Sequence, residues 1–145
     1  MSHVYLILGI AVLVSNALAA TWGGVAWTRR VPSEIFWYLL RAAQAVVVAE
    51  VVLGVVLLAN GKRPPDSLHY LYGIAPLVIS LVCEGARVTI AQSEVAHAGD
   101  LESMDRREQI LLARRIVLRE IGTMTIGAIL IVTLSLRAAS TGGGF

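Results

Sequence analysis

Four long apolar stretches constrain this chain more than any other feature of its sequence. They cover residues 4–27, 35–60, 68–92 and 115–136. At 1.5 Å per helical residue, about 20 mostly apolar residues cross the roughly 30 Å hydrocarbon core of a bilayer, so each stretch is long enough to span it. The whole chain is 57% hydrophobic and only 15% charged, which is atypical of soluble domains. Because a membrane span must satisfy its backbone internally, we predict an all-α membrane protein whose single domain, 1–145, forms a four-helix bundle.

The basic residues predict how this bundle is oriented. Four spans place both termini and the loop between spans two and three on one side, which carries Lys62, Arg63 and Arg137. The other side carries nine arginines: Arg29, Arg30, Arg41, Arg87, Arg106, Arg107, Arg114, Arg115 and Arg119. The positive-inside rule then makes the second side cytoplasmic and leaves both termini outside. We interpret the location as a bacterial cytoplasmic membrane.

The net charge of +2 comes from residues beside apolar spans, so anionic lipid is a simpler partner than nucleic acid. The longest polar stretch, about 93–114, indicates that the third and fourth helices continue into the cytoplasm as a short antiparallel hairpin. Gly99 is typical of a helix stop and Asp100 of an N-cap, which predicts a last helix over 101–137. Four arginines of this region are expected to contact lipid or a cytoplasmic partner: Arg106, Arg107, Arg114 and Arg115.

Ionisable residues inside the predicted spans are candidate functional groups, because charge is costly in a bilayer. Helical periodicity places Glu84 and Arg87 on one face of the third span, together with His69. They should lie at about the depth of three residues in the second and fourth spans: Arg41, Arg119 and Glu120. One interpretation is a network of ion pairs that locks three helix ends, and the other is a proton or ion relay.

Glu50 lies deeper than these groups, beyond the middle of the second span. We expect it to form a polar clasp with Asn16 or Ser15 of the first span. The alternatives are a proton-handling carboxylate or a contact with a cofactor or a neighbouring subunit.

Small residues recur at spacings that let membrane helices approach closely. They are Ala42, Ala45 and Ala49 in the second span, Ala20 and Gly24 in the first, and Thr123 and Gly127 in the fourth. This pattern fits either a compact bundle or an association face.

His69 is the histidine best placed to bind a b-type haem, because it lies where the polar face of the third span begins. His3, near the N-terminus, is the other candidate ligand. The alternative for His69 is an interfacial side chain bonded to Asp66, Ser67 or a lipid headgroup.

The run "EVVLGVVLLANGKRPPDSLHYLYG", residues 50–73, resembles the haem A synthase family. The similar positions are Leu53, Gly54, Pro64, Pro65, Leu68 and His69. In that family the corresponding histidine is an axial haem ligand near the outer face, and each half of the protein is a four-helix bundle. The resemblance implies the same role for His69. The chain has the size of one such half and no histidine inside its other predicted spans.

No phosphate-binding loop, zinc-binding helix motif or activated nucleophile is recognisable, and Cys83 is the only cysteine. Our first hypothesis is therefore a small non-catalytic subunit or assembly partner of a larger membrane complex, with a respiratory or electron-transfer complex as the first guess. The second is a b-type haem protein with His69 as axial ligand. The third is a small ion-coupled transporter that uses Glu50, Glu84 and Arg87.

Overall fold

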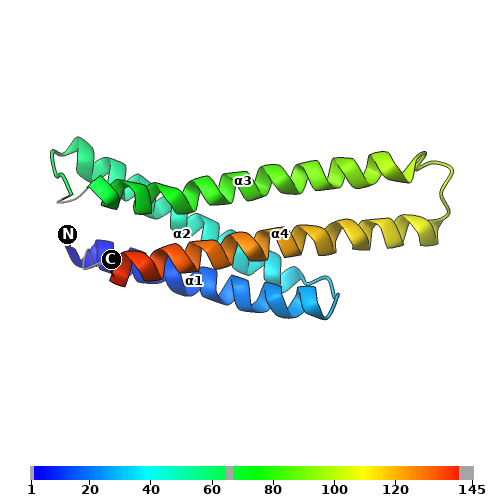
Figure 1. Cartoon of the computed structure of the whole chain (residues 1–145), viewed down its shortest axis with the longest axis horizontal. Helices are drawn as coiled ribbons and strands as arrows, with labels where there is room; N and C mark the ends of the chain where they lie inside the picture. The colour runs from blue at the N-terminus through cyan, green and yellow to red at the C-terminus, as the bar shows by residue number, and fades with distance from the viewer. Residues whose placement is uncertain (1, 65–66, 141–145) are drawn as a thin grey trace.

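The computed structural model describes residues 2–64 and 67–140 and contains four helices. Their bounds are α1 Ser2–Thr28, α2 Glu34–Ala59, α3 Ser67–Ala98 and α4 Arg106–Ser140. Each helix is long and apolar enough to cross a membrane. The helices pack together as an antiparallel bundle (Figure 1). The predicted all-α bundle with four candidate spans is confirmed.

Helix α4 lies between α1 and α3 and packs extensively against both. Helix α2 packs against α1, whereas the α2–α3 interface is the smallest of the four main ones. The beginnings of α1 and α3 and the ends of α2 and α4 meet at one end of the bundle, which we call the termini end (Figure 1). The opposite end, where α3 turns into α4, is the hairpin end. The cytoplasmic side remains a prediction from the basic residues.

Helices α3 and α4 project beyond the other two at the hairpin end (Figure 1). They have 32 and 35 residues, whereas α1 and α2 have 27 and 26. The difference corresponds to about 10 Å of extra helix at 1.5 Å per residue. The predicted helical hairpin is therefore present, and Gly99, with a positive φ of 80°, follows the end of α3 as expected.

The prediction that Asp100 caps the last helix is wrong. Asp100 accepts a hydrogen bond from the backbone N–H of Glu102 at 3.0 Å and closes a turn. Asp105 instead accepts from the N–H of Glu108 at 2.8 Å and begins α4 five residues later. The decisive signal is Glu108, because an acidic residue three positions after the N-cap is typical of a helix start.

The core is best packed where α1, α2 and α4 meet near the hairpin end. Phe36 and Ile121 are completely buried there, beside Ala26 and Met124. Ser33 begins α2 by accepting from the N–H of Phe36 at 3.3 Å. The first turn of α2 is thus fixed directly beside the core.

The outer surfaces of the bundle carry large apolar side chains, among them Ile7, Val52, Leu81 and Ile129, each half or more exposed. Such surfaces fit contact with membrane lipid. The chain itself covers the helices unevenly. In the most apolar 18-residue segment of α4, 39% of the residues are buried, but in that of α3 only 6% are.

Candidate functional site

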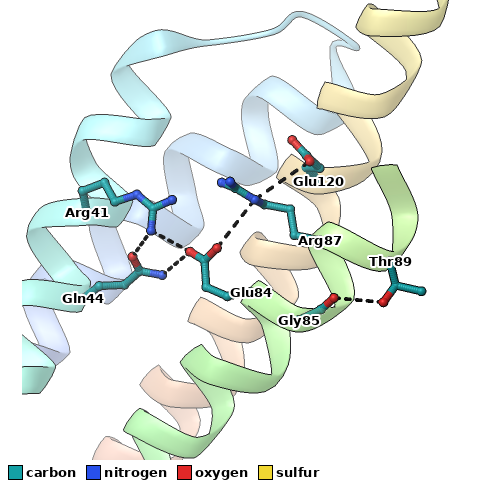
Figure 2. A network of polar contacts seen from close by, with 7 residues as sticks. All are labelled: Arg41, Gln44, Glu84, Gly85, Arg87, Thr89 and Glu120. Carbon is teal, nitrogen blue, oxygen red and sulfur yellow. Dashed lines mark hydrogen bonds and ion pairs between the residues drawn. The ribbon is translucent and has the colours of Figure 1, made fainter. Parts of the chain in front are cut away.

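Helices α2, α3 and α4 bring five polar residues together. They are Arg41, Gln44, Glu84, Arg87 and Glu120, which we call the polar network (Figure 2). One Glu84 oxygen, Oε1, accepts from Arg41 Nη1 at 2.6 Å and from Gln44 Nε2 at 2.9 Å. Arg41 also donates to the Gln44 side-chain oxygen at 2.6 Å. This triangle of contacts connects α2 to α3.

Arg87 extends the polar network from α3 to α4. Its Nε lies 3.6 Å from Glu84 Oε2 and 3.9 Å from Glu120 Oε1. Its guanidinium carbon lies 5.0 Å from the centre of the Trp37 ring, a cation–π contact. Two arginines face two glutamates, so the polar network is formally neutral. Mutual pairing lowers the cost of holding these charges in a low dielectric.

The depth of the polar network follows from its place in α2. Gln44 is ten residues after Glu34, about 15 Å along the helix at 1.5 Å per residue. Arg41 lies nearer the helix start, and its side chain is 52% exposed. The polar network therefore reaches into the span, and Arg41 forms its half-exposed edge, which we call the open side of the network.

Arg119 is not part of this network, contrary to the sequence prediction. Its Nη1 pairs with Glu94 of α3 at 2.5 Å, and Arg115 lies 3.7 Å from the same carboxylate. Arg119 and Glu120 are consecutive, so their side chains point about 100° apart around α4 and only Glu120 reaches Arg87. Glu94, Arg115 and Arg119 form a separate group, the hairpin clamp, which joins α3 to α4 near the level of the α1–α2 loop.

The predicted clasp between Glu50 and the first span is also wrong. The side chains of Asn16 and Ser15 both donate to the Val12 carbonyl of their own helix, at 2.9 and 3.2 Å. Within residues 2–64 and 67–140, Glu50 makes no hydrogen bond or ion pair. The expected clasp had a neutral Glu50 donating to Asn16 or Ser15, whereas both of these side chains bond within α1 instead.

The neighbours of Glu50 lie toward the termini end. Tyr5 of α1 is close enough to interact electrostatically with Glu50. The Tyr5 hydroxyl also packs against Gly54, where an added Cβ would lie 2.8 Å from it. Because Gly54 is one turn after Glu50, this glycine creates the space through which Tyr5 enters the bundle.

His69 contacts the same tyrosine, with ring centroids 5.7 Å apart. Helices α1 and α3 are not main packing partners, so this contact crosses the bundle interior. The Tyr5 ring thus lies beside His69, whereas His3 is exposed. Asp66, the expected partner of His69, lies outside the described residues, and the part of the chain that the structure describes holds no group of three metal-binding side chains.

The small residues divide into two sets. Gly127 faces Cys83, whose Sγ would lie 2.5 Å from an added Cβ, so this glycine permits close packing of α3 on α4. Gly24 has open space around its Cβ position, and the interhelical contact is made by Gly23. The alanines of α2 that share one stripe, Ala42, Ala45 and Ala49, are all exposed. They are available as an association face.

The four predicted arginine contacts also divide. Arg115 belongs to the hairpin clamp, and Arg114 donates to the backbone oxygen of Arg30 at 2.9 Å. Arg106 and Arg107 are exposed in the first turn of α4, about 10 Å or more beyond Arg114 along the helix.

Sequence reasoning missed Gln44, Trp37, Glu94 and Tyr5 as members of these groups. Gln44 had a usable signal, because it lies three residues after Arg41 and so shares its helical face. Glu94 and Tyr5 had none, because their partners are distant in sequence and depend on the rotation of each helix.

No family model, curated protein or solved structure matches the chain. The resemblance of residues 50–73 to haem A synthase therefore remains a sequence prediction.

Proposed function

We propose that this protein is a small non-catalytic subunit or assembly partner of a larger membrane complex, placed in a bacterial cytoplasmic membrane with both termini outside. The observation that carries this proposal is the uneven coverage of the bundle. In the most apolar segment of α3 only 6% of the residues are buried, and in that of α2 only 11% are. These two helices therefore present most of their surface to the surroundings.

Polar groups on this open side favour a protein neighbour over lipid alone. The half-exposed Arg41 and the Gln44–Glu84 contact lie beside it. Exposed Ala45 directly follows Gln44 in sequence, and Ala42 and Ala49 continue the stripe. Small side chains let a second helix approach closely, and its backbone and side chains would shield the ion pair from hydrocarbon.

A respiratory or electron-transfer complex is the first place to look, on the strength of the resemblance of residues 50–73. The other two hypotheses have less support from the structure. The Tyr5 ring lies against the proposed haem ligand His69, and the charges of the polar network are paired with one another.

Gentle extraction tests the proposal. The tagged protein should co-purify with other membrane subunits in fixed stoichiometry, and Ala45→Phe should release it by blocking the small-residue stripe. Val14→Phe is the matched control, because Val14 is 50% exposed on α1, away from the stripe. A protein that elutes as a lone monomer from native membranes under every mild detergent would contradict the proposal.

A further inference from the structure

The loop between α1 and α2 contains the only non-glycine residue with a positive φ among the described residues, Arg30, at 54°. The Arg30 N–H bonds to the Trp27 carbonyl at 3.1 Å, and the Val31 N–H bonds to the Ala26 carbonyl at 3.0 Å. This pair of bonds is the Schellman motif, whose left-handed position is usually glycine. An arginine there costs about 1 kcal/mol or more relative to glycine.

The strained position brings Arg30 close to an arginine from the far end of the sequence. Arg114 of α4 donates from Nη2 to the Arg30 backbone oxygen at 2.9 Å. Arg29 directly precedes Arg30 in the same turn. Three exposed guanidinium-bearing residues from two separate segments therefore gather beside the α1–α2 loop.

These three cations differ from the other arginines near the membrane. Arg41, Arg87, Arg115 and Arg119 each pair with a glutamate. Within the described chain, Arg29, Arg30 and Arg114 have no carboxylate within ion-pair distance, and Glu34, the nearest acidic residue in sequence, does not pair with them. Three neighbouring cations without a carboxylate partner favour an anion from outside the chain, and such an anion would stabilise this end of the bundle.

The level of the group indicates the source of that anion. Trp27, two residues before Arg29, and Trp22 are each 45% exposed, and exposed tryptophans are enriched at the membrane–water interface. The Trp27 ring also lies against Gly122, which places the loop where α4 leaves the bundle. Arginines at this level reach lipid phosphates, which guanidinium groups bind through paired, charge-assisted hydrogen bonds.

We propose that Arg29, Arg30 and Arg114 form a clamp for the phosphate of an anionic lipid headgroup. The clamp is independent of any partner complex. It also gives a reason for an arginine at position 30, where glycine would fit the backbone better.

Native mass spectrometry of the purified protein tests the clamp by measuring retention of added phosphatidylglycerol, with phosphatidylcholine and inorganic phosphate as separate probes. Arg30→Gly and Arg29→Gln should each weaken phosphatidylglycerol retention about fivefold, the effect of one interfacial cation. Arg30→Gly should leave thermal stability in phosphatidylcholine unchanged or higher, because glycine adopts the left-handed conformation readily. If glycine at position 30 changes the loop conformation, Arg29→Gln still tests lipid binding, because it leaves residue 30 unaltered.

The double variant Lys62→Gln/Arg63→Gln is the matched control, because it removes two exposed charges at the opposite end of the bundle. It should retain phosphatidylglycerol like the unmodified chain. Equal retention of phosphatidylcholine, or equal loss in this control, would overturn the proposal. Saturation of the clamp by inorganic phosphate alone, with no preference for the lipid, would overturn its assignment to a headgroup.

Discussion

The α1–α4 and α2–α3 interfaces join helices in two different ways. Between α1 and α4, glycines receive side chains of the other helix, as where Gly122 lies under the Trp27 ring and Gly23 lies against Thr125. Phe36 of α2 also packs on Gly23. Between α2 and α3, the smaller interface contains the contacts of Arg41 and Gln44 with Glu84. The first interface depends on close packing of complementary shapes, and the second contains an ion pair and hydrogen bonds.

The two interfaces contribute differently to the bundle. Interlocked apolar surfaces lose dispersion contacts steeply when displaced, so α1 and α4 form the part that holds the fold together. An ion pair stabilises less in net terms, because desolvation offsets its attraction, but it favours one register of α3 against α2. Helices α2 and α3, which the chain covers least, are thus held in register by the Glu84 contacts and keep exposed surface.

The largest expected effect comes from filling a glycine in the shape-based half. In Gly23→Ala, the new Cβ would lie within 3.0 Å of Thr125 Oγ1 and of the Phe36 ring. We expect the free energy of unfolding to fall by about 2–3 kcal/mol through overpacking. The matched control is Gly24→Ala, whose Cβ meets nothing within 4 Å, so this helix should be unchanged or stabilised by up to about 1 kcal/mol. Denaturant unfolding in detergent measures both, and equal effects would show that α1 does not pack through Gly23.

The charge-based half should respond less to the loss of its central group. Glu84→Gln removes the carboxylate shared by Arg41 and Arg87. We expect a loss of about 2 kcal/mol, because Arg41 loses its carboxylate partner and Arg87 keeps only Glu120. A double-mutant cycle with Arg41→Met should give a coupling energy of about 1 kcal/mol. Additivity of the two substitutions would mean that the ion pair does not hold α2 to α3.

The sequence was sufficient to predict the part of the fold that depends on hydrophobic length. The four spans, the helical hairpin and the stop at Gly99 all follow from apolar runs and local backbone preferences, which act within a few residues. It was also sufficient to place Arg41, Glu84, Arg87 and Glu120 at a common depth, since depth depends only on the count of residues along each helix.

Rotation of each helix was not predictable, because a shift of one residue turns a side chain by about 100°. Gly23 rather than Gly24 makes the close contact, and Glu120 rather than Arg119 joins the polar network. Glu50 lies near Tyr5 rather than Asn16 for a different reason, since these two residues of α1 share nearly the same face but lie about 16 Å apart along the helix. Periodicity of apolar residues normally fixes rotation, but a membrane helix is apolar on its lipid face as well as on its packed face.

Beyond both interfaces, the hairpin clamp should give a smaller and local effect. Glu94→Gln weakens the contacts with Arg115 and Arg119, whose side chains are more than half exposed, so we expect a loss of about 1 kcal/mol or less. Backbone amide exchange should accelerate in residues 91–98 and 106–115, while the packed spans remain protected. Glu102→Gln, an exposed carboxyl near the tip, is the control and should leave exchange unchanged. Faster exchange throughout the spans would show that the hairpin and the bundle unfold as one unit.

The smallest expected difference separates the two aspartates of the connection between α3 and α4. Asp105→Ala removes the oxygen that accepts from the Glu108 N–H, and loss of an N-cap costs about 1 kcal/mol of local helix stability. Asp100→Ala removes only the bond to Glu102 in an exposed turn, so its effect should stay within about 0.5 kcal/mol, as for ordinary surface substitutions. Amide exchange in the first turn of α4 distinguishes the two variants. A larger effect of Asp100→Ala would place the true helix start near residue 101, and the hairpin would then be continuous helix almost to its tip.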